Sequence, residues 1–127
     1  MQHLEQQPNS TAAILADLER QWNNCREQLL QLRSVREDWD GDGAYAPASS
    51  IIDGILTVIQ TDEGRRILRT PPDSVNALRD GTIALEWHVP NFEHVIMRFD
   101  DPFKAQVMKF SPGRPTSSVW QDFSNIS

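Results

Sequence analysis

The sequence has little cysteine, few basic residues and no long apolar run. Cys25 is the single cysteine in 127 residues, which excludes an internal disulfide and gives no sign of an oxidising compartment. Twelve Lys and Arg oppose eighteen Asp and Glu, and the formal charge of −6 disfavours binding to nucleic-acid phosphates. No run could span a bilayer, and the first residues lack the pattern of a signal peptide. We therefore expect a cytoplasmic protein that binds neither nucleic acid nor membrane.

The short motifs of common catalytic sites are also missing from the sequence. It contains no glycine-rich phosphate loop, no nucleophile elbow and no paired cysteine and histidine motif. Cys25 falls on the apolar side of a predicted helix with no base near it in sequence, which predicts a buried small hydrophobe rather than a nucleophile. These absences favour a protein without cofactor that is not an enzyme, with an unrecognised active site as an alternative.

Length and pattern predict one domain at residues 11–112, between a flexible N-terminus at 1–10 and a C-terminal tail at 113–127. Apolar residues recur at alternating spacings of three and four from Leu15 to Leu32, which is typical of a helix with one apolar seam. We expect this helix to run from about Thr11 to Arg36. Its seam could pack within the domain or against a helix of another chain.

A second helix is predicted to begin at Ala48 or Ser49 and to end or restart near residues 61–64, before Pro71-Pro72. Between the two helices lies a loop rich in acid and glycine, residues 37–47, which a helix cannot cross because Pro47 disfavours helical geometry at Ala46. We expect Trp39 to tuck beneath this loop. The helices and the loop together predict a helical hairpin.

The acidic loop is also a candidate calcium site. Asp38, Asp40, Asp42 and Gly43 match positions 1, 3, 5 and 6 of the EF-hand pattern. The match then fails, because position 12 falls on Ser49, where a bidentate glutamate is required. A structural turn is the stronger interpretation.

From Ser74 onward the apolar period changes to two, which predicts strands. Turn residues at 79–81, 90–92 and 100–102 separate four segments near 75–78, 82–89, 93–99 and 103–110. The apolar residues carry odd numbers, so they share one face if each loop has an odd count of residues. The residues predicted to face the core are Ile83, Leu85, Trp87, Val95, Met97, Phe99, Phe103 and Val107.

These patterns together predict an α+β fold, in which the helical hairpin packs on one face of a four-stranded antiparallel meander. The tail from Ser111 is rich in Pro, Ser and Gly, with apolar exceptions such as Trp120. That segment could add an edge strand, wrap the domain or dock on a partner.

The other face of the predicted sheet holds the remaining candidate site. His88 is expected opposite His94, with Glu86 two residues away, and two imidazoles with a carboxylate could bind zinc. A solvated polar face is the alternative interpretation, and a mixed polar and apolar surface of this kind also suits protein binding. The candidate partner-binding residues are Trp22, Glu86, His88, Phe92, His94, Ile96, Arg98 and Trp120.

Two segments of the sequence resemble a known group of proteins. Residues 39–44, Trp-Asp-Gly-Asp-Gly-Ala, followed by Ala-Pro-Ala-Ser at 46–49, precede Asp-Gly-Thr-Ile-Ala-Leu-Glu-Trp at 80–87. This order resembles small bacterial and phage proteins that have a WDG-x-GA loop and a later DG-x-I-x-L-x-W strand, a group with no established function. The resemblance implies a shared fold and a gene beside mobile or defence genes, and it assigns no site residues.

The most economical interpretation of the sequence is a small acidic binding protein of the accessory or antitoxin-like kind. Its partner would be another protein chain or a second copy, as in a homodimer. A metal-binding protein, with calcium at the acidic loop or zinc at His88 and His94, is the alternative.

Overall fold

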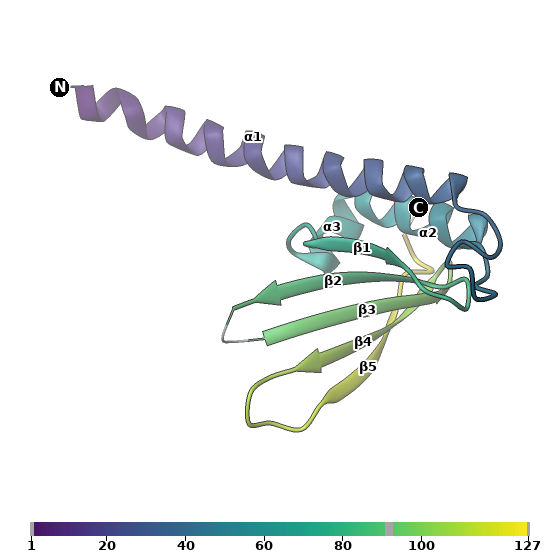
Figure 1. Ribbon diagram of the computed structural model, residues 1–127. Helices are drawn as coiled ribbons and strands as arrows, with labels where there is room; N and C mark the ends of the chain where they lie inside the picture. The colour runs from purple at the N-terminus through teal and green to yellow at the C-terminus, as the bar shows by residue number, and fades with distance from the viewer. Residues whose placement is uncertain (1, 91–92, 127) are drawn as a thin grey trace.

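A computed structural model describes residues 2–90 and 93–126, and it shows an α+β protein. Helix α1 (Gln2–Gln31) continues into a 3₁₀ turn, η1 (Leu32–Ser34), and is followed by α2 (Ser49–Gln60) and α3 (Asp62–Leu68). The strands are β1 (Ser74–Ala77), β2 (Ile83–Val89), β3 (Glu93–Asp101), β4 (Lys104–Phe110) and β5 (Ser117–Asp122). They form one antiparallel sheet in the order of the chain. The α+β class and the antiparallel sheet are thus confirmed (Figure 1).

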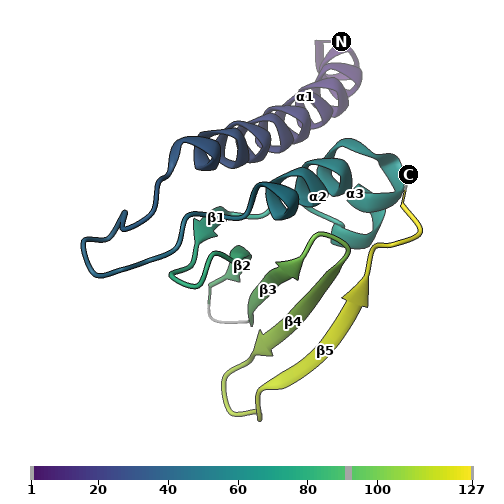
Figure 2. The same cartoon turned by 90° about the vertical axis from the view of Figure 1, so that its right-hand side faces the viewer.

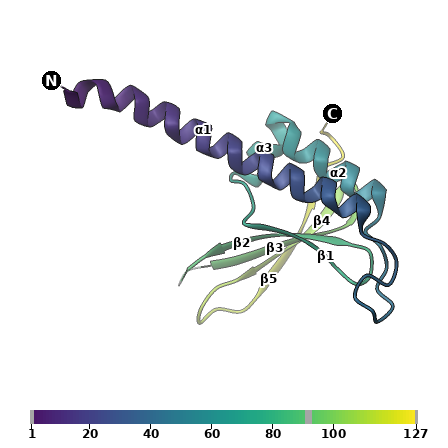
Figure 3. The ribbon, with the colours of Figure 1, turned by 45° about the horizontal axis from the view of Figure 1, so that its top comes forward.

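The helices cover one face of this sheet. Helix α2 lies against the sheet and contacts β3, while α1 runs over α2 and beside β1 (Figure 2). Helix α1 has 30 residues and is about 45 Å long at 1.5 Å per residue, so its N-terminal half extends past the sheet (Figure 3). In residues 2–90 and 93–126, no helix combines the length and the apolar composition that crossing a membrane would require.

The strand register confirms the predicted alternation of faces. Leu85 lies opposite Met97, and Ile83 lies opposite Phe99, so each pair has numbers that sum to 182. The β1–β2 turn keeps the predicted three residues, since Leu78 N–H donates to the Thr82 carbonyl and Gly81 has φ of +86°. Only glycine takes that conformation readily.

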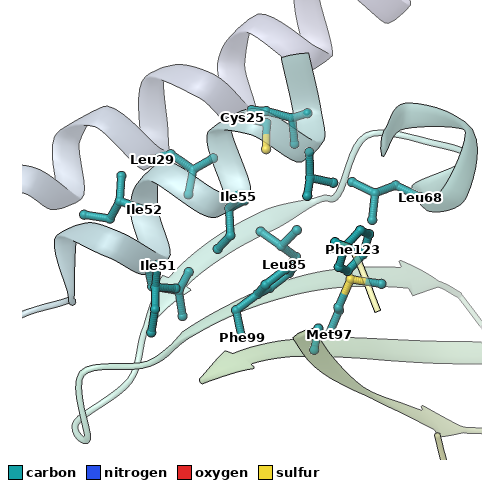
Figure 4. Close-up of a cluster of buried hydrophobic side chains, with 14 of the residues drawn as sticks. Cys25, Leu29, Ile51, Ile52, Ile55, Leu68, Leu85, Met97, Phe99 and Phe123 are labelled. Atoms are coloured by element: carbon teal, nitrogen blue, oxygen red, sulfur yellow. The ribbon is translucent and has the colours of Figure 1, made fainter. Parts of the chain in front are cut away.

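The odd-numbered face forms the core against the helices. Figure 4 shows Ile55 of α2 above Leu85, with Phe99 and Phe123 beside them. The Phe99 and Phe123 rings stack with centroids 5.4 Å apart. Cys25 and Leu29 of α1 are buried in the same cluster. Burial raises the pKa of the Cys25 thiol to about 12, so the residue is protonated and acts as a small hydrophobe.

Phe103 departs from the predicted face. It was expected to point into the core, but its side chain is 54% exposed. The register shifts between Phe99 and Asp101, and β4 begins only at Lys104. This irregularity places Phe103 in the turn, where its N–H donates to the Asp101 carboxylate. A one-residue shift beside the turn leaves the alternation of both strands unchanged, so the alternation does not reveal that Phe103 has left the core face.

Two boundaries and the position of one side chain also differ from the sequence-based expectation. The sheet has five strands rather than four, because residues 117–122 of the predicted tail pair with β4. The first helix begins at Gln2 rather than Thr11, where the sequence is polar and has no apolar period to reveal it. Trp39 was expected beneath its loop but is 41% exposed, with its indole N–H donated to the Tyr45 carbonyl at 2.9 Å.

Gly54 permits a close approach between α2 and the β3–β4 turn. A Cβ atom built on Gly54 would lie 2.3 Å from the backbone oxygen of Pro102. In an exposed helix position, Gly→Ala stabilises by roughly 1 kcal/mol. We expect Gly54→Ala instead to lower the free energy of unfolding by about 2 kcal/mol, because α2 or the β3–β4 turn must shift to make room for the methyl group. Chemical denaturation measures this, with Thr57→Ala on the exposed side of α2 as the control; a stabilised Gly54→Ala variant would contradict the packing.

Candidate interaction surfaces

The acid and glycine loop folds around its own carboxylates. Asp40 Oδ1 accepts from the N–H groups of Asp42 at 2.8 Å and Ala44 at 3.1 Å, and Oδ2 accepts from Arg79 Nε at 2.6 Å. Asp38 Oδ1 accepts from Gly43 N–H at 2.7 Å. Three acids of the EF-hand pattern are present, yet both carboxylate oxygens of Asp40 and Oδ1 of Asp38 already have partners within the chain. The arrangement closes a turn, and it supports the structural interpretation better than calcium binding.

One ion pair connects this loop to the β1–β2 turn, and a second connects that turn to β3. Arg79 follows β1 and contacts Asp40, and Asp80 precedes β2 and accepts from Arg98 at 2.8 Å. The Thr82 hydroxyl also donates to Asp80 at 2.5 Å. Hydrogen bonds from Asp42 N–H lower the pKa of Asp40, and the Thr82 hydroxyl does the same for Asp80. The loop, the β1–β2 turn and β3 are therefore held in one arrangement.

His88 and His94 lie opposite one another, as the sequence predicts. Their ring centroids are 5.4 Å apart, edge to face, and the Phe110 ring lies 5.9 Å from His94. Glu86, the expected third ligand, accepts from Asn76 at 3.0 Å and Ser74 at 3.3 Å, so it is engaged with β1. Within residues 2–90 and 93–126, no group of three His, Cys, Asp or Glu is placed to hold a metal ion. Two imidazoles alone fall short of a zinc site.

The histidines border a shallow hollow at one end of the sheet. It has a volume of about 330 Å³ and is lined by His88, Val89, Glu93, His94, Phe110, Ser111 and Pro112. Phe92, another predicted contact residue, lies outside the described residues. An open hollow of mostly apolar character with few polar groups suits surface contact better than enclosure of a small molecule.

The rest of the open sheet face is less available than predicted. Arg98 is paired with Asp80, Glu86 is engaged with β1, and Ile96 is half-buried. Trp120 is the exception, with its side chain 58% exposed and the Lys104 amine 6.0 Å from the ring centroid. The candidate residues of this face thus share a surface, but intramolecular contacts already use two of its charges.

The seam of α1 divides into a buried half and an exposed half. Trp22, Cys25 and Leu29 are buried, whereas Ile14 and Leu15 are 62% and 60% exposed. Trp22 was a predicted partner contact, but here it belongs to the core. Arg65 of α3 marks the boundary, because its guanidinium lies 5.1 Å from the Trp22 ring centroid and pairs with Glu19 at 2.6 Å. The sequence shows the seam, but only the structure shows where the domain stops covering it.

Comparisons with protein-family models, curated proteins and solved structures find no match to this chain. The function is therefore inferred from the surfaces described above.

Lowering the pH should affect stability through Asp40 and Asp80, whose carboxylates accept hydrogen bonds in the folded protein. Because the pKa values of Asp40 and Asp80 lie below the ordinary 3.8 in the folded protein, the unfolded chain binds their protons first as pH falls. Their stabilisation is complete above the unfolded value and is lost as pH falls through the folded values. We expect Asp40→Asn and Asp80→Asn each to flatten the fall of melting temperature below pH 3.8, relative to wild type.

Asn23→Gln, at an exposed residue without a titratable group, is the control for the substitution itself and should retain the wild-type slope. If the melting temperature fell equally steeply with pH in the wild type, Asp40→Asn and Asp80→Asn, the assigned hydrogen bonds would be contradicted.

Proposed function

We propose that this protein is a small acidic binding protein without catalytic activity, of the accessory or antitoxin-like kind. Its protein partner packs on the projecting half of α1, here defined as residues 10–18. The observation that supports this proposal is the division of one apolar seam into a covered and an uncovered half.

Helix energetics favour a partner at this place. In proteins, most of the stability of a helix comes from packing of its apolar face rather than from intrinsic helix propensity. Trp22, Cys25 and Leu29 receive that packing from the domain, whereas Ile14 and Leu15 are 62% and 60% exposed and Leu18 is 36% exposed. These three side chains lie at the spacings through which an amphipathic helix contacts a groove or another helix. A helix or apolar groove of the partner would therefore bury the same stripe that the domain buries further along.

The open sheet face supports the proposal less strongly. Its predicted contact residues His88 and His94 border the hollow, but Glu86 and Arg98 are held by neighbouring side chains. Breaking intramolecular hydrogen bonds of charged groups costs free energy on binding. Exposed apolar side chains on α1 carry no such cost, so the projecting helix is the preferred surface.

The double variant Ile14→Gln/Leu15→Gln tests this surface. Both side chains are mostly exposed, so folding should be unaffected, and circular dichroism with thermal melting should show this. In affinity capture from native host cells, we expect the wild type to retain a specific protein and the double variant to retain at least tenfold less. If the two side chains together contribute about 1.4 kcal/mol of binding free energy, their loss weakens binding tenfold.

Asn23→Gln/Asn24→Gln is the matched control, because it changes two exposed residues of α1 beside the domain and should retain the partner. Equal capture by wild type and the Ile14→Gln/Leu15→Gln variant would rule out the projecting half of α1 as the binding surface. An absence of specific capture by the wild type would contradict the proposal as a whole.

A further inference from the structure

Strand β5 forms an open edge of the sheet. It pairs with β4 on one side, from Lys104 opposite Asp122 to Lys109 opposite Ser117. Within the described part of the chain, no strand pairs with its other side. A strand at a sheet edge presents backbone N–H and C=O groups that can pair with another strand.

This edge lacks the devices that usually prevent pairing. Proteins protect exposed edges with proline, lysine, bulges or a covering element. The sequence of β5, Ser-Ser-Val-Trp-Gln-Asp, contains no proline or lysine, and its register with β4 is continuous. Val119 is 59% exposed and Trp120 is 58% exposed, on opposite faces of the strand. An edge with unpaired backbone and two large apolar side chains favours strand addition.

The opposite edge of the sheet is not equivalent. Strand β1 has four residues and lies beside α1, which contacts it (Figures 1 and 2). A sheet with one open edge cannot extend head to tail into a fibre through its edges. Its open edge can instead pair with the same edge of a second copy, and a two-fold axis then closes the assembly as a dimer.

Charge distribution favours an antiparallel second copy as the occupant. After Asp101 the chain has three basic residues and one acid, and these include Arg114 before β5 and Asp122 at its end. Antiparallel pairing about Val119 keeps the Asp122 side chains of the two copies at opposite ends of the paired strands. In-register parallel pairing would instead put the two Asp122 carboxylates side by side. Opposite charges across strands stabilise pairing, and like charges oppose it.

We propose that β5 pairs with β5 of a second copy, so that two five-stranded sheets join into one ten-stranded sheet around a two-fold axis near Val119. This interface lies at the end of the sheet away from α1, and it does not depend on the partner proposed for the projecting helix. One short strand gives an interface near the lower limit of about 1,000 Å² for specific contacts, so the dimer should dissociate on dilution.

Sedimentation equilibrium of the full chain tests the proposal. We expect the mass to rise from 14.5 kDa toward twice that value as concentration increases from about 1 μM to about 500 μM. Val119→Lys should raise the dissociation constant at least tenfold, because it puts like charges across the two-fold axis. Tyr45→Lys adds the same charge at a similarly exposed side chain of the acidic loop, away from β5, and should leave the dissociation constant unchanged.

A cross-linking measurement identifies the strand that pairs. The native thiol of Cys25 is buried, so an introduced cysteine supplies the reactive group. Val119→Cys should form a disulfide dimer under mild oxidation at least tenfold faster than Tyr45→Cys, at a similarly exposed position away from β5.

Three results would overturn the proposal: a monomer at every concentration, a dimer that Val119→Lys leaves intact, or equal cross-linking rates for the two cysteine variants. A dimer disrupted by Tyr45→Lys alone would place self-association away from β5 instead.

Discussion

Burial of one sheet face by α2 is the constraint on which the rest of the structure depends. Ile55, Leu85 and Phe99 are fully buried at its centre. At roughly 25 cal/mol per Å² of apolar surface removed from water, side chains of this size are the main source of stability in a small domain. The close approach of α2 to Pro102 at Gly54 keeps the two layers together. The surfaces proposed to bind partners, on α1 and β5, lie at the two ends of the molecule, beyond the reach of α2.

Much of this arrangement could be predicted because periodicity and burial have the same cause. The change from a helical to a two-residue period at Ser74 separates the layers, and an even register sum places Leu85 opposite Met97. Phe103 and β5 could not be predicted in this way. A one-residue shift in a turn leaves the pattern of both strands intact, and a short strand with polar neighbours carries too weak an alternation to be distinguished from a tail.

The sequence predicts which residues belong to the α1 seam and to the open sheet face, but not which of them the rest of the domain covers or engages. The α1 seam is visible from spacing alone, yet its boundary at Trp22 depends on Arg65, which is 43 positions later in the chain and folds back through α3. Likewise, the sequence places His88 opposite His94 but does not show that Glu86 is engaged by Asn76. Long-range hydrogen bonds of this kind decide which polar residues are available, and one-dimensional patterns do not contain them.

Amide hydrogen exchange of the monomer measures directly whether the domain supports α1 along one half only. The amides from Trp22 to Gln31 should exchange only through global unfolding. The amides from Ala12 to Leu18 should exchange at least about 100-fold faster, through local opening of a helix that nothing covers. Equal protection along the whole helix in a monomer would show that the domain supports both halves, and would contradict the division between core and binding surface.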